Sequence, residues 1–82
     1  MERIEDRVKE IISTELGIEM DKVHLNSNFT QDLGVDSLEI MQLLISLEEE
    51  FNIKIPDKDI ETLATVGDLI QYINDRAKKD VF

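Results

Sequence analysis

An aspartate and a serine stand where an irregular stretch gives way to a strongly patterned one. Residues 32–38 read DLGVDSL, and the apolar-striped segment 39–51 follows directly. Asp36 is a favoured N-cap residue, and Glu39 three positions later completes the Asp-x-x-Glu form of a capping box. Ser37 is therefore expected at or near the first helical position, where free N–H groups and the helix dipole favour an exposed anion by roughly 0.3–1 kcal/mol. The pattern predicts a phosphate-linked group on the Ser37 hydroxyl.

The same serine lacks the partners that would make it a catalytic nucleophile. A nucleophilic serine needs a general base and an oxyanion hole. The single histidine, His24, falls in a predicted loop and in no recognisable pairing with Ser37. Residues 34–38 also fail the Gly-x-Ser-x-Gly pattern of a nucleophile elbow. We therefore expect that the chain is not an enzyme.

Composition limits the partners and the environment. The 82 residues fit one domain, which we place over 1–82, and the lack of cysteine excludes disulfides and cysteine-based metal sites. Nineteen acidic against nine basic residues give a net charge of −10, which argues against nucleic acid and favours basic partners. Without a long apolar run or a signal-like start, we expect a cytoplasmic chain with no membrane span. We also expect a monomer with no bound metal.

Helical periodicity dominates the chain. Apolar residues recur at helical spacing in three segments, which predicts helices over residues 3–16, 37–51 and 66–77. Asp57 is expected to begin a short helix that runs to about Glu61. No strand-like alternation of useful length appears. The predicted fold is all-α: a small four-helix bundle of three main helices plus one short helix, with a long loop between the first and second.

The ends of these segments carry residues that helix termini prefer. Gly17 is a candidate C-cap, and Thr65 with Asp68 forms a second candidate capping box. Charged side chains that complement the helix dipole stand near the start of the first helix and the end of the last: Glu2, Glu5, Asp6, Lys78 and Lys79.

Two parts of the chain are expected to contribute to the core. In the second helix one stripe is expected to face inward, with further residues widening it: Ile40, Leu44, Leu47 and Phe51, then Met41, Leu43 and Ile45. Residues 17–36 have no regular pattern. Scattered apolar residues nevertheless predict that this long loop packs on the core, with a short turn after Asp21.

Residues 32–38 resemble the phosphopantetheine attachment motif of acyl carrier proteins. The similarity to this family covers nearly the whole chain, including residues 4–8, 47–51, 55–57 and 72–74. The resemblance implies a free-standing four-helix bundle whose serine, here Ser37, receives covalent 4′-phosphopantetheine from coenzyme A through a separate holo-carrier synthase. The thiol of that arm then holds acyl chains as thioesters during fatty acid biosynthesis. In the family the aspartate that matches Asp36 also helps the synthase to engage.

The resemblance implies two further surfaces. Acidic side chains on the second and third helices are expected to bind basic patches on the synthase and on fatty acid synthesis enzymes: Glu39, Glu48, Glu49, Asp57 and Glu61. The apolar residues between the helices are first of all a core. In this family the core can open to hold the acyl chain, here among Leu47, Phe51, Ile55, Ile60, Leu63 and Ile73.

Other functions compete with the carrier interpretation. Residues 57–68 superficially resemble a calcium-binding EF-hand loop, but Thr62 and Asp68 stand where such a loop has Gly and Glu, which leaves only loose divalent binding open. A plain interaction module would explain the charge but gives the Ser37 arrangement no purpose. Within the carrier class, a polyketide, peptidyl or other specialised carrier is the alternative. Three positions depart from the usual fatty acid pattern and leave the exact partner set open: Val35, Gln42 and Lys58.

Overall fold

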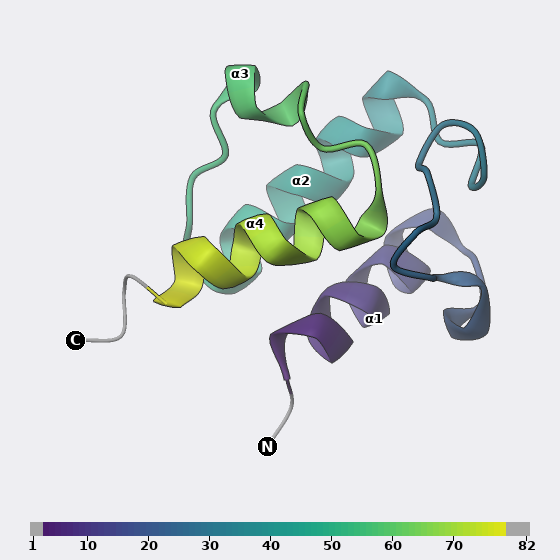
Figure 1. Ribbon diagram of the computed structural model, residues 1–82, viewed down its shortest axis with the longest axis horizontal. Helices are drawn as coiled ribbons and strands as arrows, with labels where there is room; N and C mark the ends of the chain where they lie inside the picture. Colours follow the sequence, from purple (N-terminus) through teal and green to yellow (C-terminus); the bar gives the residue numbers. More distant parts are fainter. Residues whose placement is uncertain (1–2, 79–82) are drawn as a thin grey trace.

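The computed structural model describes residues 3–78, and this part of the chain is helical, without strands (Figure 1). In chain order the elements are α1 (Ile4–Leu16), the 3-10 turn η1 (Met20–Lys22), α2 (Ser37–Phe51), α3 (Asp57–Ile60) and α4 (Val66–Lys78). This confirms the predicted bundle of three main helices plus one short helix, with helix bounds correct to about one residue. Every helix within the described residues is too short or too polar to cross a membrane. Glu2 and Lys79, like the ends of the predicted domain 1–82, lie outside the described residues.

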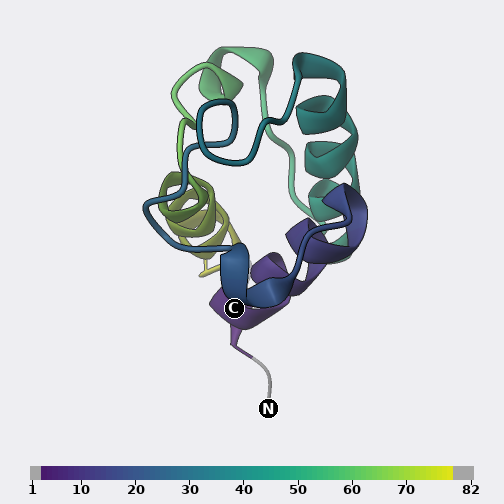
Figure 2. The same ribbon diagram turned by 90° about the vertical axis from the view of Figure 1, so that its right-hand side faces the viewer.

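The core lies between the three long helices, and α1 joins the other two. Helix α1 contacts both α2 and α4, and Figure 2 shows α2 and α4 on opposite sides with α1 between them. Each helix turns an apolar stripe inward, as its 3.6-residue periodicity predicts. The buried helical residues are Val8, Ile12, Leu43, Leu44, Leu47, Val66, Leu69, Ile70 and Ile73. Burial of each such side chain favours the folded state by about 1.5–3 kcal/mol before the entropy cost.

The outer flank of α2 departs from the sequence prediction. Leu43 is buried as expected, but Met41 and Ile45, which were expected to widen the core-facing stripe, are 41% and 50% exposed. Leu38 is 69% exposed. The prediction for Met41 and Ile45 was therefore wrong. Helix α2 packs against α1 along one stripe only, and no described element covers this flank.

The long loop between α1 and α2 is irregular but closely packed. It buries Val23, Phe29 and Val35 in the core, which confirms the predicted packing, and the predicted short turn is η1, which contains Asp21. Backbone bonds also join the loop to the start of α4: Phe29 N–H to Ala64 O, Val66 N–H to Ser27 O and Gly67 N–H to Leu25 O. The loop is thereby fixed at three successive points to one side of the bundle.

Two predicted helix caps are present, one at the end of α1 and one at the start of α4. Gly17 ends α1 in the left-handed conformation, with φ of 67°, and its N–H donates to Ser13 O. At the start of α4, the N–H of Asp68 donates to Thr65 Oγ1 over 3.1 Å, and the N–H of Thr65 donates to Asp68 Oδ2 over 3.2 Å. These reciprocal bonds confirm the second capping box.

Candidate functional site

Ser37 begins α2, and Asp36 caps that helix, as the sequence predicts. The N–H of Glu39 donates to Asp36 Oδ1 over 2.8 Å, and the N–H of Asp36 donates to Glu39 Oε1 over 3.2 Å. The two bonds complete the capping box. An N-cap aspartate stabilises a helix by about 1 kcal/mol relative to alanine, so the helix start is fixed at Ser37.

The chain reaches Ser37 from a buried anchor. Val35 is buried, and its N–H donates to Phe29 O over 2.8 Å. The preceding Gly34 has φ of 64°, a left-handed conformation that costs other residues roughly 1–2 kcal/mol. The anchor and the turn hold the backbone in place while the Ser37 side chain, two residues further on, is exposed to solvent.

The start of α2 can accept a phosphate ester. Among the described residues, the N–H groups of Ser37 and Leu38 have no acceptor, because the capping box satisfies those of Asp36 and Glu39 on either side of them. Free N–H groups at a helix start bind anions, and the helix dipole adds to the attraction. An exposed hydroxyl beside two free donors therefore fits a phosphodiester link to a larger group.

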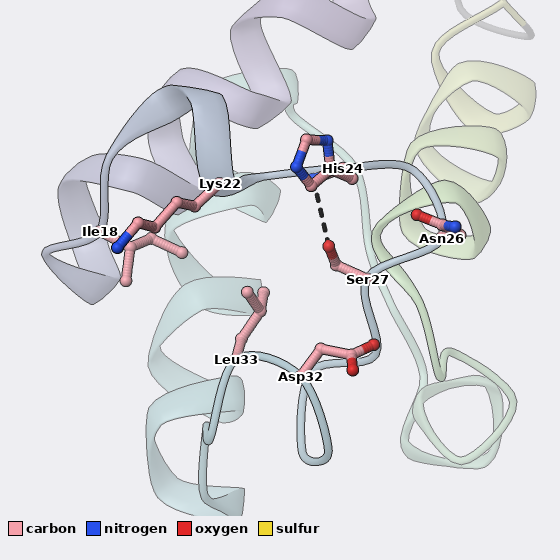
Figure 3. A pocket seen from close by; sticks show the side chains of 7 residues that line it. All are labelled: Ile18, Lys22, His24, Asn26, Ser27, Asp32 and Leu33. Carbon is pink, nitrogen blue, oxygen red and sulfur yellow. Dashed lines mark hydrogen bonds between the residues drawn. The ribbon is translucent and has the colours of Figure 1, made fainter.

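No histidine is hydrogen-bonded to this serine in the described part of the chain. Figure 3 shows His24 beside a hollow of about 510 Å³ in the α1–α2 loop, together with Lys22 and Asp32. The backbone N–H of His24 donates to Ser27 Oγ over 3.2 Å, and no hydrogen bond within residues 3–78 joins His24 to Ser37. The same residues contain no cluster of three or more metal-binding side chains.

The acidic residues expected to bind partners differ in their surroundings. Glu49, Asp57 and Glu61 are exposed and make no hydrogen bond or ion pair with another described residue. Glu39 belongs to the capping box. Glu48 is only half-exposed, and its Oε2 accepts the N–H of Ile55 over 2.7 Å, so it also shapes the turn after α2. The sequence did not indicate this second role of Glu48.

Sequence reasoning missed an exposed apolar stripe beside Ser37. Leu38, Met41 and Ile45 lie three and four residues apart on the uncovered flank of α2. Met41 and Ile45 also line a groove of about 460 Å³ between α2 and the segment that carries α3. The available signal was the number of apolar residues in α2, which is larger than one core-facing stripe needs. We call Leu38, Met41 and Ile45 the α2 stripe.

The residues expected to form an acyl pocket divide between a closed core and this groove. Leu47 and Ile73 are completely buried, and Ile55 is nearly so. Phe51, Ile60 and Leu63 are half-buried against the same core. Ile55 and Ile60 also line the groove, so the predicted set reaches from the groove into the centre of the bundle.

A polar cluster joins α3 to α4. Tyr72 Oη donates to Asp59 Oδ2 over 2.6 Å, and Arg76 Nη2 donates to the same oxygen over 3.2 Å. The Arg76 guanidinium lies 4.8 Å from the centre of the Tyr72 ring. Burial, and then the hydrogen bond to Asp59, raise the pKa of Tyr72 to about 12. Asp59 therefore engages α4 instead of converging with its acidic neighbours as a calcium loop would require.

Comparison with known proteins agrees with the geometry at Ser37. A family model described as the phosphopantetheine attachment site matches residues 6–73, from α1 to α4. Acyl carrier proteins of three Clostridium perfringens strains are each 45% identical to this chain over 74 residues, which is 90% of this chain and 97% of the relatives. Such proteins are carriers and do not catalyse the reactions of their cargo. The chain therefore belongs to the acyl carrier protein family, and its cofactor is covalently attached 4′-phosphopantetheine.

Proposed function

We propose that Ser37 is the residue that carries 4′-phosphopantetheine. The observation that carries this assignment is the start of α2, where an exposed hydroxyl lies beside two N–H groups that lack acceptors. Ser37 provides the ester oxygen, and the helix start stabilises the phosphate. When bound, the group supplies a thiol on a long arm, which holds acyl chains as thioesters. Asp36 fixes the helix start and is also proposed to engage the synthase.

Intact mass tests the attachment residue. Incubation with coenzyme A and a promiscuous phosphopantetheinyl transferase should add one phosphopantetheine to the wild-type protein and none to Ser37→Ala. Ser46→Ala is a matched control, because Ser46 lies on the same helix but its hydroxyl is bonded to Glu15. This control should be modified as fully as the wild type. Modification of a folded Ser37→Ala would contradict the assignment.

We further propose that the carrier serves fatty acid biosynthesis. Support comes from the surface around Ser37, where the α2 stripe is flanked by acidic residues: Glu39, Glu48, Glu49, Asp57 and Glu61. A partner with an apolar centre and a basic rim would complement this surface, and the net charge of −10 would steer such a partner toward it. The holo-carrier synthase and the fatty acid synthesis enzymes are the proposed partners.

Charge reversal at Glu49 tests the docking surface. Glu49 has no hydrogen-bond or ion-pair partner among the described residues, whereas Glu48 supports the Ile55 turn, so Glu49→Lys changes charge without removing a bond. We expect slower modification by the synthase at low salt, with a smaller difference at high salt. Asp75→Lys makes the same change of net charge on α4 and should have the weaker effect. Equal rates for the two variants would contradict docking at α2.

The cargo itself distinguishes the pathway from its alternative. The protein isolated from its own cells should carry saturated, hydroxylated and unsaturated acyl intermediates of fatty acid synthesis on its arm. Aminoacyl or polyketide groups in their place would assign it to a peptidyl, polyketide or other specialised pathway, with the same attachment residue. Mass spectrometry of the arm after its release from the protein separates these outcomes.

We also propose that the acyl chain is held in the interior, with the protein acting as a single-domain monomer in the cytoplasm. The groove lined by Ile55 and Ile60 supports an interior site, because the buried Leu44 of α2 also lines it. An acyl chain of medium length should then raise the melting temperature, because a ligand that binds only the folded state stabilises it. An unchanged melting temperature would count against an interior site. Sedimentation equilibrium tests the monomer.

A further inference from the structure

We propose that Asp59, Tyr72 and Arg76 form a latch that holds α3 closed, and that the latch sets how readily an acyl chain moves into and out of the interior. The three residues would thus be positioning residues that determine which chain lengths the carrier retains. This inference rests on the proposed function, in which an arm on Ser37 carries acyl chains that the interior can hold.

The backbone of the segment that carries α3 is hydrogen-bonded to the rest of the molecule only near its two ends, while Ile60 and Leu63 between them pack half-buried against the core. At one end the N–H of Ile55 donates to Glu48, and at the other Ala64 O accepts the N–H of Phe29. Between them, in residues 56–63, the backbone bonds are all local, such as Ile60 N–H to Pro56 O. Helix α3 has no buried residue. The segment is therefore built to move about its two ends.

The side-chain bonds that leave residues 56–63 all belong to Asp59. One carboxylate oxygen accepts both the Tyr72 hydroxyl and the Arg76 guanidinium, as described above. The Asp59 and Arg76 side chains are 25% and 41% exposed, so the ion pair is partly shielded from solvent. Both donors lie on α4, which is anchored in the core by Leu69 and Ile73. The latch thus joins α3, which has no buried residue, to α4, which is anchored in the core.

The latch and the groove share the same short helix. Asp59 reaches α4, while its neighbour Ile60 lines the groove between α3 and α2. When α3 lifts off both long helices, Ile60 lifts with it, and the groove that Ile60 lines with Leu44 and Ile55 opens. Figure 1 shows α3 standing apart from the long helices, with only the connecting segments beside it. Closure by the latch therefore opposes admission of a chain and also opposes its release.

Two measurements test the latch, and the first needs no cofactor. Tyr72→Phe and Arg76→Ala should each speed hydrogen exchange at the bonded amides of Ile60 and Leu63 by about tenfold, which corresponds to the loss of one net hydrogen bond of about 1.4 kcal/mol. Exchange in α1 and α2 should not change. Arg76→Lys keeps the cation and should restore most of the protection. Unchanged exchange at Ile60 and Leu63 in both variants would overturn the latch.

The second measurement uses the octanoylated protein. Without the latch, cleavage of the thioester by hydroxylamine should be several-fold faster than in wild type, and an acetyl thioester, too short to enter the core, should show no difference. Glu50→Gln is the matched control, because it removes an ion pair with Arg7 that joins α1 to α2. This control should leave both thioesters unchanged. Faster exchange with an unchanged octanoyl thioester would overturn the link to the acyl chain.

The two proposals fail in different ways. A chain that is never modified at Ser37 contradicts the proposed function by mass alone, while hydrogen exchange of the unmodified protein still decides whether the latch exists.

Discussion

The loop over residues 17–36 and the segment over residues 52–65 make an instructive pair. The loop is almost without regular structure, yet it buries Val23, Phe29 and Val35 and forms backbone bonds to the start of α4. The second segment contains a helix, yet only Ile55 is buried and its middle is tied to the bundle by the side chain of Asp59. Regular secondary structure and firm attachment are therefore separate properties, and in this protein they fall in opposite segments.

The contrast matches the demands on each segment. The loop ends at Asp36 and Ser37, so whatever fixes the loop also fixes the proposed origin of the arm. The segment with α3 borders the groove, where a wall that can move is an advantage. Local stability in proteins ranges widely within one fold, and binding regions come from its lower end.

Truncation of buried residues should reveal the contrast most strongly. Phe29→Ala removes a completely enclosed ring from the irregular loop and should lower the free energy of unfolding by about 3–5 kcal/mol. Ile60→Ala, in regular but half-buried α3, should cost about 1–2 kcal/mol. Urea denaturation measures both. An equal cost for the two variants would remove the distinction between the segments.

The next-largest effect is expected from adding a methyl group at Gly67, which contacts the loop over residues 17–36. A Cβ atom there would lie 2.8 Å from Leu25 O, the atom that accepts the Gly67 N–H over 2.7 Å. Because backbone must shift to relieve this contact, we expect Gly67→Ala to cost about 1–3 kcal/mol, although alanine favours helix. Thermal unfolding checks the sign. A more stable variant would mean that the loop yields easily, contrary to the comparison.

Replacement of Asp36 separates its two proposed roles. Asp36→Ala should destabilise the protein by about 1 kcal/mol because the cap is lost, whereas Asp36→Asn keeps a capping oxygen and should be nearly neutral. If Asp36 also engages the synthase, Asp36→Asn should be modified more slowly at unchanged stability. Denaturation and modification rates, measured on the same samples, decide between a cap alone and a cap with a second role.

The smallest expected effect is a loss of folding stability at alkaline pH, caused by ionisation of Tyr72 beside α3. The pKa of Tyr72 is raised to about 12 in the folded protein, so its contribution to stability is complete below pH 10 and is lost as pH rises through 12. Wild type should therefore lose stability over this range more steeply than Tyr72→Phe. The difference between the two proteins is the relevant quantity, because lysines titrate in the same range. Parallel curves would contradict the burial of this hydroxyl.

Much of the fold was predictable because its signals are local. Periodicity and capping residues gave the helix bounds and placed Ser37 at the start of α2. The course of the loop was not predictable, since the bond from Gly67 to Leu25 joins residues far apart in the sequence. Only its tendency to pack could be inferred, from apolar residues such as Phe29.

The surface was harder to predict than the core. Periodicity tells which residues share a face but not which faces a neighbour covers, so Met41 and Ile45 were assigned to the core. The cluster of Asp59, Tyr72 and Arg76 joins two helices through ordinary surface residue types, and nothing in their spacing distinguishes them from solvated charges. Both features depend on how the helices are placed in space.

The α2 stripe also constrains how the protein is shared. Leu38 follows Ser37 directly, so an enzyme docked on the stripe as proposed would cover the proposed attachment residue and exclude every other enzyme. Partners must then take turns, and the pace of a pathway depends on how fast each one leaves. Dissociation is the step that interface composition changes most, and a small apolar stripe with a charged rim favours short residence. If partners dock as proposed, short and mutually exclusive binding therefore follows from the position of the stripe directly after Ser37.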